Sequence, residues 1–599
     1  MPHSYGAAPV EDAQPLHAPV RFGVFELDPE SGELRKQGLK VKLQEQPFQI
    51  LQILLEHPGK VVTREELQQR IWPADTFVDF DQGLYNATKR LREALGDSAD
   101  TPRYIETLSR RGYRFIAPLN GSAPEPRKPV PAAAASDSIA VLPFLNLSAD
   151  PENEFFADGI TEEIINALAR IEQLHVVARS SAFSFKGKHL DLRIIGEQLN
   201  VRTVLEGSVR RSGNHLRITA QLVSVADGYH LWSERYDREM KDVFDIQDEI
   251  ARSIVDRLKV SLEGDRLEPL VKAGTKNLEA YQLCLKGRAL LNKRGSAIPR
   301  GLECLQRAVT LDGEYALAWV GLADAYTMIG YYGFARPEAS MPKGKDAARR
   351  AIVLGPSLAE AHNAMACACV LYERDLAQAE RELLLALELN PRYIQARCWY
   401  AFFYLGCAVG RWDEGVTHAT LAVESDPLSG YANAVLGATY LGAGRCAGAV
   451  TASERAVELD SDSFLARYIL HGALHGSGRF EEAVAVAEKA LTMSGRHAWA
   501  MAALAATLAD WGKPADAEAV YSELMARARR YYVQPTELAI AAAAAGMQDE
   551  AIRQARKAFE VCDPSRNQFS MTKDTSWPFT VRLYADPRFR EILRAAGFE

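Results

Sequence analysis

The sequence has no run of about 18 consecutive apolar residues, so it offers no segment to cross a membrane. Met1 to Ala18 are rich in proline, alanine and histidine and lack the basic and apolar parts of a secretory signal. We therefore expect residues 1–19 to form a disordered tail. A Walker-type phosphate loop is also absent. These absences lead us to expect a cytoplasmic protein without a membrane anchor.

Cysteine is scarce, and residues 1–283 contain none. Cys367 and Cys369 form a C-x-C pair on a predicted helix, where they point to different faces and suit neither zinc nor a redox C-x-x-C site. We expect all the cysteines to be reduced, small core residues. They are Cys284, Cys304, Cys367, Cys369, Cys398, Cys407, Cys446 and Cys562. The sequence predicts no metal and no cofactor.

A chain of 599 residues is too long for one hydrophobic core, and we expect three or four domains. The net charge of −8 argues against nucleic-acid binding over the whole surface, so any DNA contact has to be local. Residues 82–115 carry seven Lys/Arg against four Asp/Glu, whereas residues 21–81 carry eight against eleven. The basic residues of this region are therefore gathered at one end.

A helix is predicted from Asp81, as N-cap, to Gly96, which ends it. Its buried stripe at helical spacing is Leu84, Thr88, Leu91 and Leu95. The opposite face and its flanks carry Gln82, Tyr85, Asn86, Lys89, Arg90, Arg92 and Glu93. Amide and cationic groups of this kind read base edges or bind phosphate. The alternative for an isolated helix is a merely solvated face.

A predicted hairpin follows this helix. Residues 104–108 lead into the turn Arg110-Arg111-Gly112, and residues 113–116 leave it. Paired arginines at a hairpin tip suit insertion into a DNA groove. A helix followed by a basic hairpin is the order of a winged helix-turn-helix, which favours DNA binding. The candidate DNA-binding residues are Tyr85, Asn86, Lys89, Arg90, Arg92, Arg110, Arg111 and Tyr113.

Residues 20–119 resemble the winged-helix output domain of OmpR/PhoB-type regulators, especially the CadC-like branch. The resemblance rests on residues 22–27, 47–56, 62–67, 71–72, 89–97 and 104–115. It implies that Asn86, Lys89 and Arg90 lie on the DNA-reading helix, with Arg110 and Arg111 in the wing. Two departures matter. CadC-like proteins continue into a transmembrane helix, whereas residues 120–136 read as a flexible Pro/Ala linker. Only about twenty residues precede the winged helix, so we expect no phosphorylatable receiver domain.

Residues 137–263 alternate predicted strands and helices, which favours a small α/β domain with a mixed sheet. The sequence of residues 140–144, 156–163 and 204–210 resembles that of the TolB amino-terminal-like domain. Asp158, Glu162 and Glu163 cluster at what we expect to be a helix start, where the helix dipole favours acids; Thr161 to Glu163 are therefore interpreted as capping. We assign no active site, because the histidines lack ligand spacing and nothing resembles a cyclase catalytic domain.

Residues 277–599 contain a repeat of fixed period. Small residues recur every 34 positions at Gly415, Ala449, Ala483, Ala517 and Ala551. A second series follows seven residues later at Ala422, Ala456, Ala490 and Ala558, interrupted only by Leu524. This period is typical of tetratricopeptide repeats, and we expect about eight of them with a C-terminal cap. Trp399, Tyr400, Phe402, Phe403 and Tyr404 are interpreted as inter-repeat packing rather than a ligand cage.

The predicted fold class is multidomain: a winged helix-turn-helix, a small α/β mixed-sheet domain and an all-α tetratricopeptide superhelix. We expect a one-component transcriptional regulator, not an enzyme. Its predicted partners are double-stranded promoter DNA, a protein or peptide in the groove of the repeats, and a second copy on DNA. The alternative is a tetratricopeptide scaffold whose winged helix makes protein contacts; the equal numbers of acidic and basic residues in 21–115 allow this.

Overall fold

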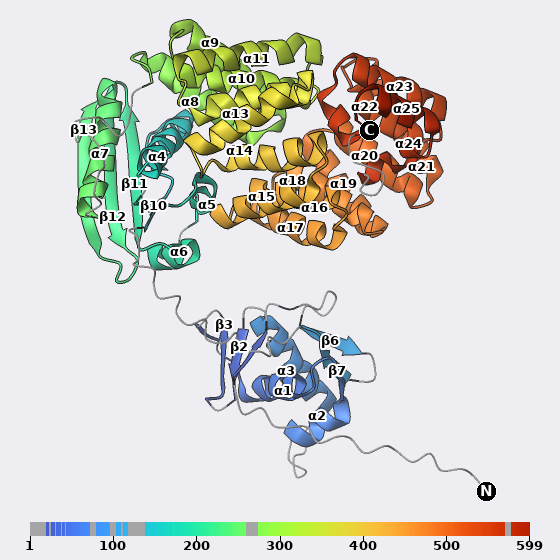
Figure 1. The fold of residues 1–599 in the computed structure, drawn as a ribbon. Coiled ribbons are helices and arrows are strands. Elements are labelled where there is room, and N and C mark those ends of the chain that lie inside the picture. The colour runs from blue at the N-terminus through green and yellow to red at the C-terminus, as the bar shows by residue number, and fades with distance from the viewer. Residues whose placement is uncertain are drawn as a thin grey trace. The chain divides into compact units, whose positions relative to one another are not determined.

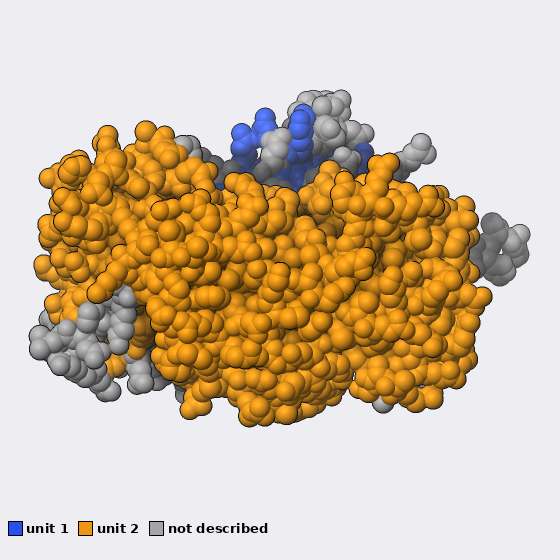
Figure 2. Space-filling view, turned by 90° about the horizontal axis from the view of Figure 1, so that it is seen from above, with its two compact units in different colours: residues 1–134 blue, residues 135–599 orange. Residues whose placement is uncertain are grey.

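The computed structural model describes residues 19–117, apart from 23–24, 30, 37–38, 42, 72–79, 96, 98–103 and 109–111. It also describes residues 138–258, apart from 172 and 189, and residues 274–569 and 577–598. Several predicted features lie outside these residues: the Pro/Ala linker, Gly96 and the arginines of the wing tip. The predicted tail also lies outside them, except for residue 19. The chain divides into two compact units, residues 1–134 and residues 135–599 (Figure 2).

The first unit begins with an antiparallel sheet in the order β1-β2-β3-β4 and ends with a second antiparallel sheet in the order β5-β7-β6. The strands are β1 Val20–Phe22, β2 Phe25–Asp28, β3 Glu33–Lys36, β4 Leu39–Val41, β5 Val61–Thr63, β6 Ile105–Leu108 and β7 Gly112–Phe115. The helices are α1 Glu45–Glu56, α2 Arg64–Ile71 and α3 Phe80–Leu95. Phe22, Phe25, Tyr104 and Phe115 form an aromatic cluster that joins the two sheets. This is the predicted winged-helix order of elements.

The second unit begins with a six-stranded mixed sheet whose main path is β10-β8-β11-β12-β13, with β9 paired to β11 (Figure 1). Its strands are β8 Ser138–Val141, β9 Leu145–Asn146, β10 His175–Val176, β11 Thr203–Ser212, β12 His215–Ser224 and β13 His230–Glu239. Its helices are α4 Glu154–Ala169, α5 Arg179–Phe183, α6 Leu192–Leu199 and α7 Val243–Arg257. The mixed-sheet prediction is confirmed, because β8 pairs in parallel with β10 and β11, and β11 pairs antiparallel with β12.

The capping interpretation of Thr161 to Glu163 is wrong. The helix α4 starts at Glu154, so these residues lie in its middle. Thr161 is buried; its hydroxyl donates to the Ala157 carbonyl at 2.9 Å and accepts from the Phe144 N–H at 3.0 Å. The helix begins earlier than the acidic cluster suggested because the apolar residues Phe156 and Ile160 already belong to its buried face.

The repeats follow as helical hairpins, in which consecutive helices pair (Figure 1). The first helices are α8 Leu278–Lys293, α9 Ile298–Leu311, α10 Ala316–Tyr331, α11 Pro337–Leu354, α12 Ala359–Ala368, α13 Leu376–Leu389, α14 Ile394–Trp399 and α15 Trp412–Ser425. The rest are α16 Gly430–Gly442, α17 Cys446–Leu459, α18 Phe464–Gly476, α19 Phe480–Ser494, α20 Ala498–Asp510, α21 Pro514–Ala528, α22 Pro535–Ala544 and α23 Gln548–Glu560. The small residues of both 34-residue series are buried, since neighbouring helices approach closely there.

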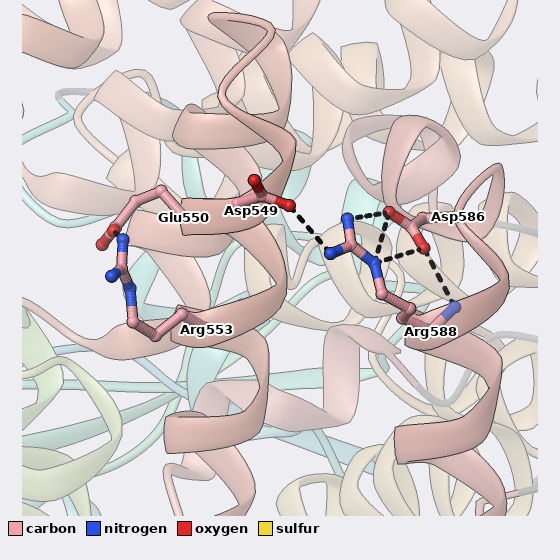
Figure 3. A network of polar contacts seen from close by, with 5 residues as sticks. All are labelled: Asp549, Glu550, Arg553, Asp586 and Arg588. Carbon is pink, nitrogen blue, oxygen red and sulfur yellow. Dashed lines mark hydrogen bonds and ion pairs between the residues drawn. The ribbon is translucent and has the colours of Figure 1, made fainter.

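The array ends in a cap formed by α24 Val581–Tyr584 and α25 Pro587–Ala595. Asp586 is the N-cap of α25 and accepts from the Arg588 backbone N–H at 2.9 Å. The Arg588 guanidinium also reaches Asp549 on α23 at 2.8 Å, as Figure 3 shows. This contact joins the cap to the last repeat.

The sheet and the repeats belong to one unit because charged and apolar contacts cross between them. Glu162 on α4 pairs with Arg179 at 2.9 Å and with Arg288 on α8 at 2.5 Å. Burial alone raises the pKa of Glu162, but the two guanidinium groups outweigh it and lower that pKa. Gly159 allows α4 to approach α8, since a Cβ there would lie 2.4 Å from the Leu285 side chain. The sheet and the repeats therefore pack together as one compact unit.

Candidate nucleic-acid interface

The helix α3 has the predicted division into a buried and an exposed face. Leu84, Thr88, Leu91 and Leu95 are buried, together with Ala87. Thr88 is accommodated in the helix because its hydroxyl donates to the Leu84 carbonyl at 2.8 Å. The helix starts at Phe80, so Asp81 lies in its first turn and is not the N-cap. The buried stripe fixes the orientation of α3 against α1 and so determines which side chains face solvent.

Asn86, Lys89 and Arg90 are exposed on α3, away from its buried stripe. The Arg90 guanidinium donates to the side-chain carbonyl of Gln44, which lies just before α1. The structure places Tyr85 within α3 and does not describe its side chain. An amide and two cationic groups therefore line one solvent-facing surface of the helix.

Arg92 joins α3 to the wing. Its Nη2 atom donates to the Ile105 carbonyl and to the Thr107 hydroxyl, both at 2.7 Å. Sequence reasoning placed Arg92 among DNA-contacting residues on the flank of α3; the structure shows its guanidinium bonded to β6. These two bonds hold α3 beside the first strand of the wing.

The wing itself is the β6–β7 hairpin, in which Ile105 lies opposite Phe115 and Leu108 opposite Gly112. Gly112 has φ +150°, and a Cβ at this position would lie 2.0 Å from the Val62 carbonyl oxygen of β5. Only glycine lets β7 approach β5 this closely. Arg110 and Arg111 at the tip lie outside the described residues. Tyr113 is only 4% exposed, so the interface proposed below does not include its ring.

The repeats enclose a second candidate site, a narrow cavity on their inner surface with a volume of about 80 Å³. Nine of the 21 residues that line it are aromatic: Tyr331, Tyr332, Trp399, Phe402, Phe403, Tyr431, Tyr468, Trp499 and Trp577. Three residues of the run interpreted as inter-repeat packing, Trp399, Phe402 and Phe403, thus line a cavity. The segment around Trp577 belongs to the C-terminal cap, so the chain's own end contributes to the wall.

Within the described parts of the chain, no three His, Cys, Asp or Glu side chains gather in an arrangement that could hold a metal ion. The cysteines are free thiols, most of them buried. None of the helices in those parts combines the length and the apolar character needed to cross a membrane.

Comparison with known families assigns three regions. Residues 38–115 match the family "Transcriptional regulatory protein, C terminal". Residues 134–253 match "HilA/YgeH-like transcriptional regulator, second domain", and residues 474–534 match "Tetratricopeptide repeat". The chain therefore combines an OmpR/PhoB-type winged-helix DNA-binding domain, a HilA-like second domain and C-terminal tetratricopeptide repeats.

Individual proteins are similar over parts of the chain. A protein named "Putative adenylate cyclase 3" from Rhizobium meliloti is 38% identical over 270 residues, which are 45% of this chain and 44% of that protein. The "Transcriptional regulator HilA" of Salmonella typhi is 24% identical over 331 residues, 54% of this chain and 56% of that protein. The chain thus spans about half the length of these curated relatives. The DNA-binding domain of Klebsiella pneumoniae RstA, solved in complex with the RstA box, is 30% identical, covers 17% of this chain and 98% of its own, and has a TM-score of 0.15.

Proposed function

We propose that this chain is a one-component transcriptional regulator in the cytoplasm, which binds promoter DNA through α3 and the β6–β7 hairpin. The observation that carries the proposal is the exposed surface of Asn86, Lys89 and Arg90 on a helix tethered to its wing by Arg92. The match of residues 38–115 to regulator output domains supports the same function. In this proposal α3 enters the major groove and the hairpin lies beside it.

Arg92 serves as a positioning residue in this proposal. A helix in the major groove and a hairpin in the neighbouring groove must keep a fixed spacing, and the two bonds from Arg92 to β6 hold that spacing before DNA arrives. Lys89 and Arg90 supply cations for phosphates, and Asn86 supplies an amide for a base edge. Arg110 and Arg111 remain proposed wing contacts.

The salt dependence of binding tests this proposal against the scaffold alternative. A regulator that neutralises several phosphates loses affinity steeply as salt rises, and it selects particular sequences. A scaffold whose winged helix contacts protein would retain no selected DNA. Full-length protein is titrated over a salt series with a DNA sequence that it selects and with a scrambled version of that sequence. Equal, weak binding to both sequences would contradict the regulator.

We further propose that the repeats receive the signal as a protein or peptide whose apolar side chains enter the aromatic cavity. The apolar walls of the cavity and the repeat architecture support this assignment. Phe402 and Tyr431 line the cavity and are only partly buried, so each can be shortened at moderate cost. A partner captured by the full chain from its source cells should be lost from a Phe402→Ala/Tyr431→Ala variant. Retention of the same partner by the variant would contradict the cavity as its site.

A further inference from the structure

The strand β13 forms a long open edge of the mixed sheet. It spans His230–Glu239 and pairs with β12 on one side (Figure 1). Within the described residues no strand pairs with its other side. Only Trp232 and Tyr236 of this strand are buried, and both belong to the set of side chains that faces the core under α7. Unpaired edges of this length are templates for pairing with another strand.

The hydrogen-bonding direction of each residue in β13 can be assigned. The Met240 N–H donates to the Asn214 carbonyl at 2.9 Å, which continues the register of His215 opposite Glu239. In an antiparallel ladder, residues alternate between bonding to the partner strand and pointing away from it. Even-numbered residues from 234 to 240 therefore bond to β12. The backbone groups of Ser233, Arg235 and Asp237 point outward.

The charges of β13 are self-complementary about Tyr236. In an antiparallel pair of two copies centred on Tyr236, Arg235 lies opposite Asp237 of the second copy, and Glu234 lies opposite Arg238 of the second copy. Each pair occurs twice, which gives opposite charges at four positions. A shift of two residues would instead place Arg235 opposite Arg235 or Asp237 opposite Asp237, which repel. The outward backbone groups of Arg235 and Asp237 also meet in the centred register.

The Arg235 and Asp237 side chains are available for these contacts, whereas Glu234 already accepts from Trp232 and Tyr236, and Arg238 lies 3.8 Å from Glu249. Among the described residues Arg235 has no ion-pair or hydrogen-bond partner, and it is exposed. Asp237 is held by Arg217 of β12, but both bonds go to its Oδ2 atom, at 3.0 and 2.5 Å. Neither bond uses its Oδ1 atom. A second guanidinium can therefore bind Asp237 without displacing Arg217.

We propose that a second copy of this chain pairs with β13, antiparallel and centred on Tyr236, to make one continuous sheet across the dimer. The proposal rests on the proposed function for its purpose, since the dimer brings two winged helices to adjacent half-sites. Each cross-strand charge pair stabilises the dimer only slightly, so the dimer is weak alone and strengthens on DNA through effective concentration.

Sedimentation equilibrium of the full chain without DNA tests the interface independently of DNA binding. The wild type should show a reversible monomer–dimer equilibrium. Arg235→Asp and Asp237→Arg should each weaken it by about tenfold or more, because each places like charges opposite one another. A mixture of the two variants should form heterodimers, since opposite charges then face each other in all the Arg235/Asp237 positions.

Two further variants separate pairing from folding. Arg235→Pro removes an outward N–H that β12 does not use, so it should abolish the dimer while the fold, followed by circular dichroism, is retained. Arg217→Ala removes the neighbour of Asp237 on β12 and should leave the dimer intact. A wild type that stays monomeric at every concentration, a dimer indifferent to charge reversal, or a variant mixture that fails to associate would each overturn the proposal. A dimer with no selected DNA would overturn only the proposed function.

Discussion

The Nη2 atom of Arg92 lies 2.7 Å from the carbonyl oxygen of Ile105, so the proposed reading helix is bonded directly to the first strand of the wing. A charged donor on a carbonyl contributes roughly 1.5–3 kcal/mol when the acceptor would otherwise be left unpaired. The bond explains how α3 and the hairpin that follows it present one proposed DNA-binding surface.

Arg92→Ala should loosen the wing without unfolding α3. We expect faster hydrogen exchange over residues 105–108 and 112–115, and at least a tenfold loss of affinity for the selected DNA, because the helix and hairpin no longer hold one spacing. Arg90→Ala is the matched control: its partner is Gln44, so it should weaken DNA binding while exchange in β6 stays unchanged. Unaltered exchange in the Arg92 variant would contradict the tether.

Lys89→Ala should lower DNA affinity several-fold on every sequence and reduce the slope of log affinity against log salt by about one. The reason is that an exposed lysine on α3 is assigned to a phosphate. The control is Arg35→Ala in β3, where the guanidinium pairs with Glu33 at 2.9 Å on the opposite sheet of the unit. An unchanged salt slope for Lys89→Ala would remove Lys89 from the interface.

Gly112→Ala should destabilise the wing by several kcal/mol, because the new Cβ would meet the Val62 carbonyl oxygen at 2.0 Å. Gly59→Ala tests strain alone, since Gly59 has φ +76° with nothing within 4 Å of a Cβ. We expect the Gly59 variant to lose about 1 kcal/mol and keep DNA binding. Thermal unfolding and DNA titration of both variants give the comparison; equal effects would argue against the close approach of β7 to β5.

Glu537 in α22 makes the stability of the repeats depend on pH. Burial and the neighbouring Asp563 raise its pKa to about 8, against a hydrogen bond from Gln568 that lowers it. A carboxyl whose pKa is raised on folding costs stability as pH rises from its unfolded value of about 4.5 to about 8. The melting temperature should therefore fall over this range, and Glu537→Gln should reduce the fall. Glu488→Gln, on the exposed side of α19, should not.

Local patterns predicted much of the fold. The alternation of strands and helices over residues 137–263 predicted the mixed sheet, and helical spacing predicted the buried stripe of Leu84, Thr88, Leu91 and Leu95. The repeat period was read from two series of small residues inside the helices, although a third series, of glycines between the helices, was available. Gly410, Gly444, Gly478, Gly512 and Gly546 recur at the same period and all have φ between +71° and +81°, where glycine is favoured in the turn between paired helices.

The sequence did not predict which side chains of different elements contact one another. Nothing local indicates that Glu162 pairs with Arg288, or that Arg92 bonds to β6. Tyr113 illustrates the same limit: alternation in a short strand does not decide which face is covered, and Tyr113 lies in the buried core of the winged helix. Which strand ends at an open edge, as β13 does, depends on the strand order of the whole sheet.

We propose above all that this chain selects promoter DNA. Full-length protein and a Lys89→Ala/Arg90→Ala/Arg111→Ala variant are incubated with sheared genomic DNA of their source, and the retained fragments are sequenced. We predict a few discrete promoters for the wild type and their loss from the variant. Retention of no selected sequence, with both proteins behaving alike, would contradict the regulator and favour the scaffold.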